Sequence, residues 1–118
     1  MKSILIVDDE DDIRCLYETE LESEGFRAHS VGSGEEALTF MDGNNNIDLI
    51  ILDIKMGQMD GLQVLEQLRS KIANVPVILN SAYSTYKNNF TSWLADAYLV
   101  KTSDLTELKC KVKELLSA

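Results

Sequence analysis

The chain has 118 residues, of which 45% are hydrophobic, so it is long and apolar enough to fold as one domain over residues 1–118. No apolar run approaches the roughly 18–20 residues that a membrane span needs. With 11 basic and 20 acidic residues, the net charge is −9, which repels a phosphate backbone. We therefore expect no membrane contact and no nucleic-acid contact by this domain alone. A divalent cation or a basic partner surface is a better match to the charge.

Short apolar runs alternate with helical patterns along the whole chain. Five runs are predicted strands, at residues 4–7, 26–31, 49–52, 75–79 and 97–100. The first, third and fourth are apolar throughout, as expected of strands that are covered on both faces. The second is mixed in character, which favours a place near an edge of the sheet.

Helical patterns occupy the intervals between the strands. The first helix carries an apolar stripe of Ile13, Leu16, Tyr17 and Leu21. Three further helices begin at pairs typical of helix caps, namely Ser33 with Glu36, Asp60 with Gln63, and Asp104 with Glu107. A poorly patterned stretch at 85–95 is predicted to form one more helix, between the fourth and fifth strands.

This alternation of strands and helices predicts an α/β fold with a doubly wound (βα)5 architecture. Right-handed crossovers would place the strands parallel in one sheet, with helices on both faces. In open sheets of this kind, ligands bind at the carboxyl ends of the strands. The functional residues are therefore expected directly after the strands.

Polar side chains follow four of the five predicted strands. Asp8 and Asp9 follow the first strand, Asp53 the third, Ser81 the fourth and Lys101 the fifth. Three carboxylates that meet at one edge repel one another, and a hard cation such as Mg²⁺ would relieve this repulsion. A lysine and a hydroxyl nearby can hold phosphoryl oxygens. The set suits an aspartate that attacks phosphorus and keeps the phosphoryl group as an acyl phosphate.

The segments that carry these residues resemble the receiver domain of bacterial two-component response regulators. The signatures are "ILIVDDE", "DLIILDIKMGQMDGLQVLEQLR" and "AYLVK", and the likeness covers essentially the whole chain. The resemblance implies a flavodoxin-like sheet with strand order 2-1-3-4-5. It also implies a cytoplasmic signalling protein of a two-component system or phosphorelay. Such a protein is not an enzyme beyond its own phosphotransfer and autodephosphorylation.

The resemblance assigns a role to each residue around the phosphorylation site. Asp53 would be the phosphoacceptor. Asp8, Asp9 and Asp53, with the backbone carbonyl of Lys55, would hold Mg²⁺ or Mn²⁺, one of the first two through water. Lys55 and Tyr83 border the site, and their bulk predicts slow hydrolysis of the phosphoryl group, over many minutes or longer.

The resemblance also implies how phosphorylation is received and passed on. The phosphoryl group would come from a histidine kinase or a histidine phosphotransfer protein. Ser81 and Lys101 would bind its oxygens, and Tyr98 would turn inward when the hydroxyl at position 81 moves. A downstream protein would then bind the face made by the fourth helix, the fifth strand and the fifth helix.

Three features depart from the family pattern. Thr102 follows Lys101 where the family usually has proline after a cis bond. Such a bond before threonine costs about 2.5–4 kcal/mol, so either it is cis and strained, or it is trans and Lys101 points elsewhere. Gly57 replaces a common proline and loosens the loop beside Asp53. The interval from Ser81 to Lys101 is about two residues short.

Several alternatives remain open at this point. The departures leave room for a receiver-like interaction module that works without phosphorylation. A flavodoxin is disfavoured by the acidic first loop, and a haloacid-dehalogenase-like phosphatase by the missing second acid after Asp53. His29 and the acids Asp11 and Asp12 are interpreted as structural, and the isolated Cys15 and Cys110 fit a reducing cytosol. The chain would be either a stand-alone regulator or the receiver of a longer protein.

Overall fold

A computed structural model describes residues 1–43, 46–54, 61–72, 74–82 and 94–117. Its centre is a five-stranded parallel sheet in the order β2-β1-β3-β4-β5. The strands are β1 (Ser3–Val7), β2 (Arg27–Val31), β3 (Leu49–Leu52), β4 (Val77–Ser81) and β5 (Ala97–Val100). The predicted strand order, the parallel pairing and the edge position of the second strand are confirmed.

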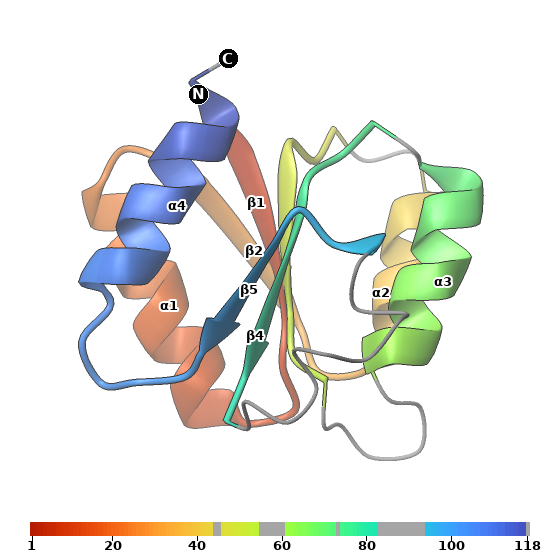
Figure 1. The fold of residues 1–118 in the computed structure, drawn as a ribbon, viewed down its shortest axis with the longest axis horizontal. Coiled ribbons are helices and arrows are strands. Elements are labelled where there is room, and N and C mark those ends of the chain that lie inside the picture. The colour runs from red at the N-terminus through yellow and green to blue at the C-terminus, as the bar shows by residue number, and fades with distance from the viewer. Residues whose placement is uncertain (44–45, 55–60, 73, 83–93, 118) are drawn as a thin grey trace.

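Helices cover both faces of the sheet, as Figure 1 shows. They are α1 (Asp11–Ser23), α2 (Gly34–Asp42), α3 (Gly61–Lys71) and α4 (Thr106–Leu116). The helices α1 and α4 lie on one face, and α2 and α3 lie on the other. Residues 85–93 of the helix predicted before β5 fall outside the described part of the chain, so the element labelled α4 is the last predicted helix. Among the described residues, no helix is long and apolar enough to cross a membrane.

The three central strands are buried on both faces, which explains why their sequences are apolar throughout. Along β1, Leu5 and Val7 pack into the core beneath α2 and α3, whereas Ile4 and Ile6 pack into the core beneath α1 and α4. Side chains alternate between the faces of a strand, so one run of aliphatic residues fills both cores. The strand ends are thereby fixed between two packed layers.

The structure corrects three local predictions. The fourth strand begins at Val77, because Pro76 has no N–H to donate, and it extends to Ser81 rather than ending at residue 79. The expected pairing of Asp104 with Glu107 is wrong, since the Asp104 carboxylate accepts from the Thr106 N–H at 3.0 Å. Leu16, assigned to the apolar stripe of the first helix, is 42% exposed.

The cap at the start of α2 is confirmed. The Ser33 hydroxyl oxygen accepts a hydrogen bond from the Glu36 N–H at 3.1 Å. Such a bond satisfies one of the N–H groups that a helix start leaves without an intrahelical partner. This cap fixes where the chain turns from β2 into α2, close to the carboxyl edge of the sheet.

Candidate functional site

The polar residues that follow the strands meet at the carboxyl edge of the sheet. Val7 pairs with Leu52 in the parallel register, so Asp8 and Asp53 leave neighbouring strands at the same level. The Asp53 N–H donates to the Val7 carbonyl at 2.9 Å, and this bond fixes Asp53 beside β1. The sequence-predicted convergence of these two acids is present in the structure.

Lys101 lies between the two buried acids. Its ammonium is 2.7 Å from Asp8 Oδ2 and 3.3 Å from Asp53 Oδ2. Asp8 is 2% exposed and Asp53 is 5% exposed, so both carboxylates have lost most of their water. The backbone N–H of Lys101 donates to the Ser81 carbonyl at 2.6 Å, and this contact positions the lysine at the end of β5.

One ammonium does not balance the charge of this edge. Burial raises the pKa of Asp53 to about 6; Lys101 opposes this rise, and the negative charges of Asp8 and Asp9 add to it. For Lys101, burial alone would lower the pKa, but its hydrogen bond to Asp8 and the charge of Asp53 outweigh burial and raise it. The ammonium therefore stays charged, while the Asp53 carboxylate is held at an energetic cost.

A cluster of carboxylates occupies the loop between β1 and α1. Asp8, Asp9 and Glu10 each place a carboxylate oxygen so that the three lie within 4.8 Å of one another. The Glu10 N–H also donates to Asp8 Oδ1 at 3.0 Å. Carboxylate oxygens close together are the donors that Mg²⁺ prefers, so this set fits the ion. Asp53 does not belong to this group of three.

Glu10 is a candidate ligand that the sequence prediction did not include. It is exposed and stands immediately before α1, where an acid is also favoured by the helix dipole. The only sequence signal for it is its place as the third acid in the run after β1. That signal does not separate a metal ligand from a helix-start acid.

The sequence that carries this site was compared with known protein families. The family model for the response regulator receiver domain matches residues 4–113. The chain is a member of the response regulator receiver family. The family resemblance of the sequence is thus confirmed over nearly its whole length.

The curated relatives described next are regulatory proteins that are longer than this chain. Regulatory protein AtoC of Escherichia coli is 36% identical over 115 residues, which cover 96% of this chain and 25% of AtoC. Transcriptional regulatory protein SrrA of Staphylococcus aureus is 39% identical over 115 residues, covering 96% of this chain and 47% of SrrA. The chain thus spans between a quarter and about half of these relatives.

Solved structures of similar length share the fold. Response regulator TrrA of Thermotoga maritima, crystallised in complex with Mg²⁺ and BeF, is 47% identical with a TM-score of 0.94, covering 98% of this chain and 100% of TrrA. TrrA was also solved in complex with the histidine kinase ThkA; that TrrA chain is 46% identical with a TM-score of 0.92, at coverages of 98% and 99%. A CheY-like receiver from Methanospirillum hungatei is 31% identical with a TM-score of 0.93, at 99% and 94%.

Gly61, at the start of α3, sets how close this helix of the receiver domain comes to Asp53. A Cβ at this position would run into the Asp53 carbonyl oxygen and would lie 2.7 Å from Ile54 Cα. The Gly61 N–H donates to the Ile54 carbonyl at 2.6 Å. Only a residue without a side chain allows this contact, so Gly61 fixes the backbone that carries Asp53. Sequence reasoning gave it no role.

The peptide bond before Thr102 is trans, since the described residues of the receiver domain contain no cis peptide bond. The alternative that a trans bond would aim Lys101 elsewhere is nevertheless wrong. The Thr102 hydroxyl accepts from the Asp104 N–H at 3.2 Å, and the Asp104 carboxylate in turn accepts from the Thr106 N–H at 3.0 Å. This turn leads from Lys101 into α4 while Lys101 still reaches both acids.

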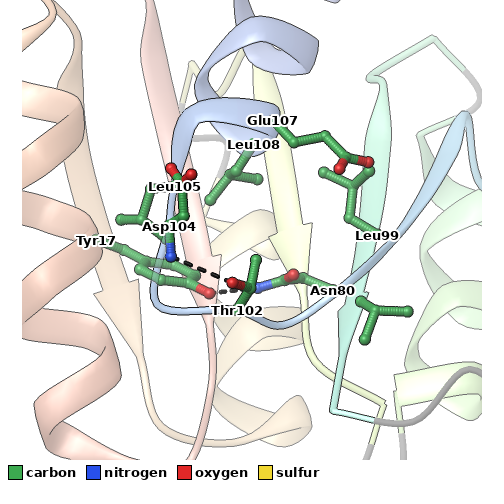
Figure 2. A pocket seen from close by; sticks show the side chains of 9 residues that line it. Tyr17, Asn80, Leu99, Thr102, Asp104, Leu105, Glu107 and Leu108 are labelled. Carbon is green, nitrogen blue, oxygen red and sulfur yellow. Dashed lines mark hydrogen bonds between the residues drawn. The ribbon is translucent and has the colours of Figure 1, made fainter.

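A buried pair of neutral polar groups lies behind the site. The Asn80 side-chain amide donates to the Tyr17 hydroxyl at 2.6 Å, joining β4 to α1 (Figure 2). Both residues are buried, and they line a small cavity with the residues of the turn into α4 and with Leu99. Sequence reasoning assigned Tyr17 to the core and did not foresee its polar partner.

Three further residues with a predicted role lie on strands of the sheet. Ser81 is fully buried at the end of β4, and Tyr98 is half-buried against the core beneath α2 and α3. His29 lies on β2, and its ring centroid is 5.6 Å from that of Phe40. Lys55 and Tyr83 lie outside the described residues. Their predicted effect on the lifetime of the phosphoryl group stays a prediction.

Proposed function

We propose that this receiver domain accepts a phosphoryl group on Asp53 from a partner histidine and passes the change to another protein. The supporting observation is the buried Asp53 carboxylate, which shares the ammonium of Lys101 with Asp8 at the carboxyl edge of the sheet. The donor class is a histidine kinase or a histidine phosphotransfer protein. That a relative, TrrA, was solved in complex with a histidine kinase supports the kinase as donor.

In the transfer, an Asp53 carboxylate oxygen forms a bond to phosphorus as the bond from the donor imidazole nitrogen to phosphorus breaks. The imidazole leaves with the electron pair of the broken bond, and Asp53 keeps the phosphoryl group as an acyl phosphate. Lys101 is close enough to pair with a phosphoryl oxygen on Asp53. The Ser81 hydroxyl would donate to another of these oxygens.

We propose Asp8, Asp9 and Asp53 as the side chains that hold Mg²⁺, with Mn²⁺ as a substitute, and add Glu10 as a candidate. The backbone carbonyl of Lys55 stays a proposed ligand. When bound, the ion offsets the negative charge of the phosphoryl oxygens and of the acids around them. The mixture of one buried and two exposed acids in the β1–α1 loop leaves room for bound water, as Mg²⁺ requires.

The proposed response to phosphorylation passes through Ser81 and Tyr98. Phosphorylation would favour a pre-existing active conformation because only that conformation brings Ser81 to the phosphoryl group. The expected output face comprises the predicted helix at 85–95, β5 and α4. Val100, on β5, exposes 44% of its surface and gives this face an apolar residue.

The scope of the proposal is one receiver unit over residues 1–118, with no catalytic turnover of a separate substrate. The free, exposed cysteines Cys15 and Cys110 agree with the reducing compartment expected for it. The partners proposed above are partners of the receiver only. The output of a longer protein would depend on the domains joined to it. Nucleic acid and membrane are not proposed as partners of this unit.

The test is intact-mass spectrometry after incubation with acetyl phosphate, with and without Mg²⁺. We expect one phosphoryl group on the wild type with Mg²⁺ and none on Asp53→Asn. Asp12→Asn is the matched control, because Asp12 is an exposed acid of α1. It should gain the phosphoryl group like the wild type. Failure of the folded wild type to gain mass with Mg²⁺ would instead favour the interaction module that needs no phosphorylation.

A further inference from the structure

The side chain of Arg14 reaches back from α1 to the backbone of the acidic loop. Its guanidinium donates to the Asp8 carbonyl oxygen at 2.6 Å, through Nη1. Its other terminal nitrogen, Nη2, pairs with the Asp11 carboxylate. The Arg14 side chain is only 20% exposed, whereas that of Asp11 is 90% exposed. The contact with Asp8 is therefore the more protected of the two.

The place of Arg14 is unfavourable on electrostatic grounds alone. It is the fourth residue of α1, and a cation near the start of a helix is opposed by the helix dipole. An exposed ion pair such as that with Asp11 contributes little. The bond to a partly buried carbonyl is thus the contact that accounts for the position of the guanidinium.

The guanidinium also lies close to Gly32. A Cβ built on Gly32, at the turn from β2 to α2, would lie 3.0 Å from Arg14 Nη1. The preceding residue, Val31, accepts a hydrogen bond from the Asp8 N–H at 3.2 Å. The guanidinium therefore fits between the acidic loop and this turn, and the absence of a side chain at Gly32 makes room for it.

We propose that Arg14 is a positioning residue that keeps the carboxylates of Asp8, Asp9 and Glu10 together for Mg²⁺. The hypothesis rests on the metal role given to this loop in the proposed function. Three carboxylates within 4.8 Å repel one another, and nothing in their own charges keeps them close. The Asp8 peptide group is where the chain enters this cluster. Holding its carbonyl fixes the direction in which the next two residues leave β1.

This role makes a prediction that is opposite in sign to a simple charge effect. A cation near the acids lowers their affinity for another cation, so removing its charge should tighten Mg²⁺ binding. If Arg14 holds the loop in place, its removal should weaken Mg²⁺ binding, by about tenfold, at the low end for residues that orient metal ligands. The direction of the change separates the two effects.

The experiment is a titration with Mg²⁺ alone, followed by the backbone amide signals of the loop in ¹H–¹⁵N NMR spectra. The variants are Arg14→Met and Gly32→Ala, and the matched control is Arg27→Met. Arg27 is an exposed arginine at the end of β2 that lies away from Gly32, and its replacement by methionine removes the same charge. Gly32→Ala keeps every charge and displaces only the end of the flexible Arg14 side chain. If Arg14→Met does not fold, the Gly32→Ala variant still tests the proposal.

We expect weaker Mg²⁺ binding in Arg14→Met, a smaller loss in Gly32→Ala and wild-type affinity in Arg27→Met. Arg14→Lys keeps the charge but has a single donor nitrogen, so its Mg²⁺ affinity should lie between those of Arg14→Met and the wild type. Equal or tighter binding in Arg14→Met would overturn the positioning role while leaving the proposed function intact. A wild type whose spectrum does not respond to Mg²⁺ would instead remove the metal step itself, and this inference with it.

Discussion

The two ends of the sheet treat charge in opposite ways. At the amino end, Asp96 accepts from the Val77 N–H at 2.8 Å and from Arg69 at 2.6 Å. Arg69 also donates to the backbone carbonyls of Leu94 and Val75, at 2.8 and 2.7 Å. At the carboxyl end, the single ammonium of Lys101 faces two buried acids, with two exposed acids in the adjoining loop.

The difference shows that the carboxyl end of the sheet, where the site lies, carries charge that lowers the stability of the fold. The amino end pairs each of these charges with an opposite charge or a backbone group, so this partly exposed ion pair leaves neither charge without a partner. The carboxyl end keeps the Asp53 carboxylate dry and short of positive charge, so its pKa is raised to about 6 by burial and by the neighbouring acids. An incoming cation is bound more strongly where such an excess of negative charge already exists.

The largest expected effect comes from removing the ammonium of Lys101, which Asp8 and Asp53 share. Lys101→Met leaves Asp8 and Asp53 buried without the ammonium that they share, and breaking a buried pair in this way costs about 3–5 kcal/mol. We expect the free energy of unfolding in urea to fall by about that amount in EDTA, and by less in Mg²⁺. The ion would replace part of the missing positive charge.

Arg69→Met is the matched control for this prediction, at the amino end. Its loss also lowers the free energy of unfolding, since two carbonyls and Asp96 lose a donor. Mg²⁺ should restore none of that loss. A Lys101→Met variant as stable in EDTA as the wild type would contradict the stabilising role of Lys101 between the two buried acids.

The second prediction concerns pH and the Asp53 carboxyl group. Its pKa rises from 3.8 to about 6 on folding, so between these values the folded protein binds more protons than the unfolded one. The free energy of unfolding therefore falls as the pH rises through this window, by about 3 kcal/mol at most. Asp53→Asn should remove this fall, and should be about 2 kcal/mol more stable than the wild type at pH 7.5 without Mg²⁺.

Urea unfolding of both proteins at pH 4, 5, 6 and 7.5 in EDTA measures this difference. The gain should vanish toward pH 4, where the wild-type carboxyl group is protonated in the folded state. Asp96→Asn, the equivalent change at the amino end, should destabilise the protein at pH 7.5, because that carboxylate pairs with Arg69 and accepts from the Val77 N–H. A less stable Asp53→Asn at pH 7.5 would contradict the raised pKa.

The parts of the molecule that could be predicted from sequence are those in which a single physical effect outweighs all others. Burial on both faces makes the central strands apolar, so β1, β3 and the acids that follow them were visible without coordinates. The strand order followed from the resemblance and is confirmed. The meeting of Asp8, Asp53 and Lys101 required only that parallel strands end at one edge.

The features that escaped prediction depend on contacts between distant segments. The contact of Gly61 with the Asp53 backbone and the bond from Asn80 to Tyr17 join residues whose separate patterns look ordinary. Leu16 fits an apolar stripe, yet no element covers it fully. The turn after Lys101 depends on the hydrogen bond from the Asp104 N–H to the Thr102 hydroxyl. Noting that the family usually has proline at this position could not reveal that bond.

The smallest expected effect tests whether everything at the carboxyl end is charge-driven. Tyr17→Phe removes the acceptor of the Asn80 amide, and a buried donor left in this state costs about 1–2 kcal/mol of unfolding free energy. Because the pair is neutral, the loss should be the same with and without Mg²⁺, unlike that of Lys101→Met.

A double-mutant cycle with Asn80→Leu completes the comparison. Replacing both partners by apolar groups is nearly neutral when the shape is kept, so the double variant should recover much of the loss of Tyr17→Phe. Additive losses from the two substitutions would mean that the bond between α1 and β4 contributes nothing of its own. A loss that Mg²⁺ reduces would mean instead that the pair is coupled to the charges in front of it, and that the carboxyl end behaves as one electrostatic unit.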